Sequence, residues 1–178
     1  MKLCAVTILL TGVLCAQEPA NPLVATSKAV YANSKNDVLG SLDSIPDNLW
    51  SYQPTKEVRT VGQLFAHIAD GQYEFCSPVA EGKNVSKNIE KNLHTKAEIA
   101  PALKEAFAYC DAAYSKMTDA DAAQLVPFFG RKMTKLGILD FNTAHNMEHY
   151  GNLVTYMRLN GIVPPSSQPR RPAAAKKN

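Results

Sequence analysis

Residues 142–161 have the sequence NTAHNMEHYGNLVTYMRLNG and carry two histidines, His145 and His149, four positions apart. On an α-helix this spacing is a little over one turn, so both imidazoles project from one face and can share a cation. A single pair of this kind is common by chance. Its significance depends on whether the rest of the chain supplies a third ligand and the helices to hold it.

The first 16 residues have the layout of a secretory signal peptide: Lys2 near the start, an apolar run, and the small residue Ala16 at the end. We expect cleavage after Ala16 and export, to the periplasm or the extracellular medium. A lipoprotein acylated on Cys15 is the less favoured alternative, because Gly12-Val13-Leu14 lacks the small residue expected just before a lipidated cysteine. No stable membrane span is expected, since no segment approaches the roughly 20 apolar residues that a membrane helix needs.

The remaining chain, about 160 residues, fits one domain with a substantial core. Once Lys2 is removed with the signal, 18 basic side chains stand against 16 acidic ones, and nothing suggests a nucleic-acid surface. Residues 166–178 are rich in Pro, Ala, Ser, Arg and Lys, a composition typical of a disordered tail. We therefore expect a signal peptide over residues 1–16, a domain over residues 17–165 and a basic tail over residues 166–178.

Apolar residues recur at three- and four-residue steps in four stretches, which predicts four amphipathic helices. Capping boxes mark the starts of the second and third, at Thr60 with Gln63 and at Thr95 with Glu98. Proline is expected to end the first helix at Ile45 and the second at Ser77. The expected helices lie at about residues 23–45, 61–77, 96–117 and 135–160. Residues 126–133 form a short apolar connector with a turn at Gly130.

The fold predicted from these helices is all-α, a single four-helix bundle. Residues 79–94 are polar and lack a helical period, and a connection of this length favours a long crossover between helices 2 and 3. Cys76 and Cys110 lie about 16 and 15 residues after their helix caps, so they are level only if those two helices run parallel. We therefore expect an up-down-down-up bundle with a Cys76–Cys110 disulfide; two buried free thiols are the alternative.

Three histidines, His67, His145 and His149, fall on or beside the apolar faces of the predicted helices. His94 precedes a helix cap and is expected at the surface. Each histidine taken alone is more typical of a hydrogen-bonded core residue, but three together would leave several buried nitrogens in need of partners. One divalent metal satisfies them all, and three neutral imidazoles leave a coordination position open, as in catalytic zinc sites. All-nitrogen ligation suits Zn, Ni, Cu or Fe.

Metal-bound histidines usually donate their second N–H to a carboxylate or a carbonyl. Asp70, Asn142 and Glu148 lie within about a turn of the predicted ligands and are the candidates for this role. Glu148 or Asp70 is also the candidate for a general base. The alternative for each is a solvated polar residue on the flank of a helix.

Two segments resemble the DinB-like metalloprotein superfamily: RTVGQLFAHIAD at residues 59–70, and the stretch from Asn142 to Pro165. The resemblance implies a four-helix bundle with a crossover between helices 2 and 3. It also implies one divalent metal held by three histidines, here His67, His145 and His149. Relatives include S-transferases and isomerases that use the metal to activate a low-molecular-weight thiol, and relatives often dimerise, which leaves a homodimer open.

From the sequence we expect an exported metal-dependent enzyme that hydrolyses an unidentified small molecule, with zinc the most expected ion and Ni or Fe as alternatives. A thiol S-transferase is the alternative within enzymes, although cytosolic thiols are scarce in an oxidising exported compartment. A non-catalytic metal-binding or interaction module is the alternative outside them. The simplest alternative is a helical bundle whose histidines are vestigial and no longer bind a metal.

Overall fold

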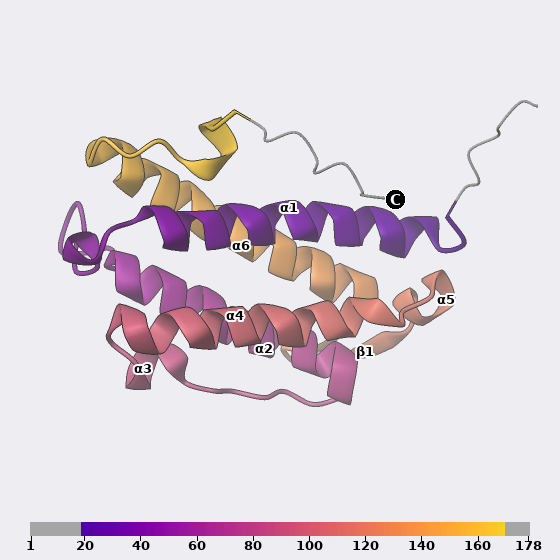
Figure 1. The fold of residues 1–178 in the computed structure, drawn as a ribbon. Helices are drawn as coiled ribbons and strands as arrows, with labels where there is room; N and C mark the ends of the chain where they lie inside the picture. Colours follow the sequence, from indigo (N-terminus) through magenta and orange to yellow (C-terminus); the bar gives the residue numbers. More distant parts are fainter. Residues whose placement is uncertain (1–18, 170–178) are drawn as a thin grey trace, which may run out of the picture.

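The computed structural model describes residues 19–169 and is mostly helical (Figure 1), with six α-helices and one two-stranded sheet within that range. The all-α prediction is therefore confirmed apart from this small sheet. The predicted signal peptide over residues 1–16 and the end of the tail from residue 170 lie outside the described residues.

Four long helices share one hydrophobic core. In Figure 1, α1 and α6 run in one direction, whereas α2 and α4 run in the other. Helix α2 packs against both α4 and α6, and α1 covers α6 and α4. Aromatic and aliphatic side chains from all four helices, such as Tyr31, Phe65, Phe107 and Leu153, are almost fully buried between them. Their bounds are Pro22–Ser44 (α1), Val61–Glu81 (α2), Lys96–Ser115 (α4) and Lys135–Leu159 (α6).

The helix starts follow the capping chemistry of the sequence. Thr60 and Thr95 each accept a hydrogen bond from the backbone three residues on, and the side chains of Gln63 and Glu98 reach back to them. The predicted end of α2 at Ser77 is wrong, because the helix continues through Pro78 to Glu81. A proline in the last turn removes only one backbone hydrogen bond, and Gly82, with φ of 72°, ends the helix instead.

The connections contain short elements that the periodicity did not reveal. The long segment after α2 includes α3 (Ile89–Asn92), and α5 (Asp119–Ala122) follows α4. The expected apolar connector is an antiparallel hairpin of β1 (Leu125–Phe128) and β2 (Arg131–Thr134), which contacts α2 and α6. Two 3-10 helices complete the order, η1 (Asp47–Leu49) and η2 (Pro165–Ser167). No helix among residues 19–169 has both the length and the apolar character needed to cross a membrane.

The two cysteines of the domain lie deep in the core at disulfide distance. Cys76 of α2 and Cys110 of α4 are both fully buried, and their Cα atoms are 5.3 Å apart. Their similar offsets from the Thr60 and Thr95 caps bring them level, because α2 and α4 run in the same direction. The pair thus joins the two helices that flank the long connection.

We expect the domain, unfolded without reductant, to show no titratable thiol. With a sequence separation of 34 between the cysteines, the double variant Cys76→Ala/Cys110→Ala should lose about 3–4 kcal/mol of unfolding free energy, chiefly by freeing the unfolded chain. Urea denaturation of both proteins measures this difference. Two reactive thiols per unfolded wild-type chain would contradict the bridge.

Candidate metal centre

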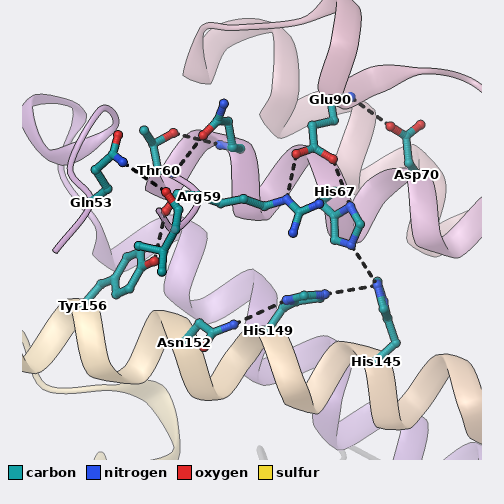
Figure 2. Close-up of polar contacts among 12 residues, drawn as sticks. Gln53, Arg59, Thr60, His67, Asp70, Glu90, His145, His149, Asn152 and Tyr156 are labelled. Carbon is teal, nitrogen blue, oxygen red and sulfur yellow. Dashed lines mark hydrogen bonds and ion pairs between the residues drawn. The ribbon is translucent and has the colours of Figure 1, made fainter. Parts of the chain in front are cut away.

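Three histidines converge between α2 and α6 (Figure 2). His67 comes from α2, and His145 and His149 come from consecutive turns of α6. The Nε2 atom of His145 lies 3.2 Å from Nε2 of His67 and 3.1 Å from Nε2 of His149. One nitrogen from each ring lies within 4.8 Å of the others, so the three predicted ligands form one cluster. His94 is exposed, as expected.

The donor set fits a divalent transition metal. The Nδ1 atom of His67 faces a carboxylate oxygen of Glu90 at 2.9 Å, so it carries the ring hydrogen and leaves a lone pair on Nε2 toward the cluster. Two nitrogens bound tetrahedrally at 2.0–2.1 Å stand about 3.3 Å apart, close to the observed spacings. Without a cation, each pair of facing Nε2 atoms would need a hydrogen on one of them.

The surroundings favour neutral imidazoles, the form that binds metals. Burial, followed by the charges of His149, His67 and Arg59, lowers the pKa of His145 to about 3. Burial and then the charge of His67 also lower the pKa of His149, although the charge of Glu148 acts in the opposite direction. Protons therefore compete poorly for these nitrogens at neutral pH.

Glu90 is the carboxylate at the centre, and sequence reasoning missed it. One of its oxygens accepts from Arg59 Nε at 2.7 Å while the other faces His67 (Figure 2). Burial raises the pKa of Glu90, but the hydrogen bonds and charges of Arg59 and His67 outweigh it and hold that pKa below its usual value. Glu90 lies in the polar, aperiodic connection after α2, where no sequence pattern singles it out.

Asp70 was expected to accept a hydrogen bond from a histidine, but it binds the backbone of α3 instead. Its two carboxylate oxygens accept hydrogen bonds from the backbone N–H groups of Ile89 and Glu90, both at 2.8 Å. These are the first N–H groups of α3, so Asp70 anchors that short helix to α2. Asp70 makes no hydrogen bond or ion pair with a histidine; it positions Glu90, which does face His67.

Neither of the other two polar candidates makes a hydrogen bond or an ion pair with the three histidines. Asn142 is buried in the core, where its amide donates to Gln72 Oε1 at 2.9 Å and lies 3.3 Å from Cys110 Sγ. Glu148 is exposed and makes no hydrogen bond or ion pair with any residue from 19 to 169. The side-chain amide of Asn152, one turn after His149, lies 3.5 Å from His149 Nδ1 (Figure 2).

Gly71 gives the His145 ring the space it occupies. A Cβ atom at Gly71 would stand 2.6 Å from Cε1 and 2.9 Å from Nδ1 of that ring. Gly71 lies one turn after His67 on the same helix, so α2 carries a candidate ligand at residue 67 and makes room for the His145 ring at residue 71. Sequence reasoning assigned this glycine no role.

Comparison with known proteins places the fold and the cluster in a family. The family model of the DinB superfamily matches residues 31–153. The chain belongs to the DinB superfamily. This span contains all three histidines and the residues around them.

Individual members of the superfamily are similar over most of their length. The uncharacterised protein YjoA of Bacillus subtilis (strain 168) is 26% identical over 119 residues, 65% of this chain and 77% of YjoA. The crystal structure of YjoA has a TM-score of 0.66 at 23% identity, covering 85% of this chain and 100% of that one. A DinB-like protein from Bacillus cereus ATCC 10987 gives 0.68 at 21% identity, covering 79% and 95%.

A protein with a named activity shares the fold at lower identity. The mycothiol-dependent maleylpyruvate isomerase has a TM-score of 0.60 at 14% identity, and the match covers 73% of this chain and 60% of the isomerase. At this identity the likeness concerns the fold alone.

Replacing Gly71 with alanine should weaken metal binding without unfolding the protein. The added methyl group overlaps the His145 ring, so we expect at least about a tenfold loss of zinc affinity. Gly151→Ala is the matched control, because it lies in α6 with open space around its Cβ position. It should keep the metal and gain about 0.5–1 kcal/mol from helix propensity. Competition titration with a chromophoric chelator compares the two, and equal affinities would contradict the close-approach role.

The metal-free protein should become less stable as the pH falls below about 6.5. An unfolded histidine binds a proton near that pH, whereas folded His145 does not until a pKa of about 3, so the unfolded state gains protons first. The resulting loss begins below the unfolded pKa and continues down to the folded one. Between pH 7 and 5.5, chelated wild type should lose about 1 kcal/mol more than His145→Gln. Urea denaturation at both pH values checks this, and parallel losses would contradict it.

Proposed function

We propose that this DinB-superfamily protein is an exported metal-dependent enzyme of the hydrolytic type, with one divalent ion held by His67, His145 and His149. The observation that supports this most strongly is the convergence of three Nε2 atoms in a largely buried place, where shared ligation of one cation gives all of them a partner. Zinc is the first expectation, and Ni and Fe are the alternatives. We further propose that α1, α2, α4 and α6 form an up-down-down-up four-helix bundle.

The surrounding side chains have separate roles in this proposal. A bound ion would supply Lewis acidity to a water or a substrate oxygen. Glu90 keeps the ring hydrogen of His67 on Nδ1, so that Nε2 remains a ligand. Arg59 is paired with Glu90 at 2.7 Å and so holds that carboxylate beside His67. Both Asp70 oxygens are engaged with α3, so Glu148, whose carboxylate is free among residues 19–169, is the better base candidate.

Export remains part of the proposal. The signal-like first 16 residues and the buried cysteine pair at disulfide distance both suit an oxidising compartment. Cleavage after Ala16, a disordered tail and a homodimer stay predictions from the sequence.

A metal-dependent thiol S-transferase is the second candidate. It is favoured by the fold shared with the mycothiol-dependent isomerase, and the same three histidines would serve it. Export argues against it, because low-molecular-weight thiols are scarce outside the cytosol. A non-catalytic metal-binding module would use the same ligands without turnover.

Metal content and turnover of protein purified without an affinity tag separate these candidates. Wild type should contain about one equivalent of a transition metal, and His149→Ala less than about a tenth, because one of three ligands is lost. The control, His94→Ala, removes an exposed histidine outside the cluster and should retain the metal. Hydrolysis of ester, amide or phosphate probes should follow the metal content.

Other results of the metal and turnover measurements would favour one of the alternative functions. Less than about a tenth of an equivalent in wild type, under chelator-free conditions, excludes the metal site. A full equivalent with no turnover of any probe favours the binding module. Turnover only with added low-molecular-weight thiols favours the transferase.

A further inference from the structure

A row of phenylalanine rings leads from the three-histidine cluster to the surface. The Phe75 ring lies 5.2 Å from the His145 ring, centroid to centroid, and 5.3 Å from Phe141. Phe75 also lies 5.8 Å from Phe128, which is 4.4 Å from Phe129. We call Phe75, Phe128, Phe129 and Phe141 the aromatic wall. Its inner members are buried, whereas Phe141 is 44% and Phe129 60% exposed.

The aromatic wall is continuous with the row of ligands on α6. Phe141, His145 and His149 follow one another at four-residue intervals, so they form one stripe along the helix. Phe75 extends this stripe from α2, and the β1–β2 hairpin adds Phe128 and Phe129. Three separate elements thus bring apolar rings to the same side of the His145 ligand.

Phe129, which carries the most exposed ring of the aromatic wall, has an energetically unfavourable backbone conformation. Phe129 and Gly130 are the two central residues of the hairpin turn between Phe128 and Arg131, with φ of 46° and 74°. Turns with two positive φ values usually place Asn, Asp or Gly at the first of these positions. A bulky residue there is an outlier, and such outliers cluster at functional sites. Because Phe129 is mostly exposed, burial offsets little of this cost.

Leu125, on the same hairpin, is an ordinary exposed residue with which Phe129 can be compared. It is also 60% exposed, but it sits at the far end of β1, opposite Thr134, in regular strand geometry. Single exposed apolar side chains of this kind are common on soluble proteins. Phe129 differs by its strained backbone and by its unbroken chain of ring contacts to a candidate metal ligand.

We propose that the aromatic wall binds the apolar part, an aryl or bulky alkyl group, of a ligand whose polar head lies at the three-histidine cluster. The inference rests on the proposed function and narrows its substrates to small molecules with such a group beside the reacting one. Phe129 and Phe141 are the exposed residues that determine this specificity.

Binding of simple metal-directed probes to the zinc-loaded protein tests the aromatic wall without knowledge of the substrate. Acetohydroxamate, benzohydroxamate and phenylacetohydroxamate share one head group and differ in the apolar part. By calorimetry we expect the aryl probes to bind at least about tenfold more tightly than acetohydroxamate, about 1.4 kcal/mol. The zinc content is measured after each titration, so that extraction of the metal is not counted as binding.

Substitutions in the hairpin and in α6 then show which side chains cause the preference for aryl hydroxamates. Phe129→Asn removes the ring but suits the turn, because asparagine adopts positive φ readily. We expect its melting temperature to equal or exceed that of wild type, while the aryl preference falls at least about threefold and acetohydroxamate affinity stays the same. Phe141→Ala should lower the preference likewise. Leu125→Ala, with the same exposure on the same hairpin, should leave it unchanged.

The outcomes separate this inference from the function on which it rests. If none of the three hydroxamates binds the zinc-loaded protein, the proposed open metal site fails. Equal binding of all three, or an aryl preference that persists in both Phe129→Asn and Phe141→Ala, overturns the aromatic wall and leaves the metal site standing. A Phe129→Asn protein that melts lower and binds every probe equally less well assigns the ring a structural role, which also overturns the inference.

Discussion

Three largely buried imidazoles meet where α2 packs against α6, and their nitrogens need one partner that all three can share. Each ring directs Nε2 at the others, and burial makes protonation of His145 costly, so charging the rings cannot relieve the crowding cheaply. Shared ligation of a cation can. Two features help to hold these nitrogens together: the His145 ring packs closely against Gly71, and the Glu90 carboxylate orients His67.

The long connection between α2 and α4 supports this centre. Asp70 fixes the first turn of α3, α3 presents Glu90, and Glu90 orients His67 while holding Arg59. A crossover of some length is needed in any case when two neighbouring helices run parallel. Here part of it carries the carboxylate that a metal-bound histidine usually requires.

Features that arise from repetition and local chemistry could be predicted from the sequence, whereas features that depend on three-dimensional proximity could not. Apolar spacing and threonine caps placed the long helices. The four-residue step from His145 to His149, together with His67 beside another apolar face, predicted the cluster. Glu90 lies in a segment without a period, and the role of Gly71 appears only when α6 lies against α2. Asp70 was chosen for being near His67, but its carboxylate caps a helix of four residues, too short to show a period.

A buried polar pairing sets the register in which the histidines meet. Gln72 donates to Asn146 Oδ1 at 2.6 Å and accepts from Asn142 at 2.9 Å, and all three side chains are fully buried. Sliding α6 along α2 by one turn would bury these amides without partners, at a cost of roughly 1–3 kcal/mol for each unsatisfied group. Apolar contacts tolerate such shifts better, because they are not directional. Because Asn146 follows His145 directly and Gln72 follows Gly71, the register that pairs Gln72 with Asn142 and Asn146 also brings His145 into the space above Gly71 and toward His67.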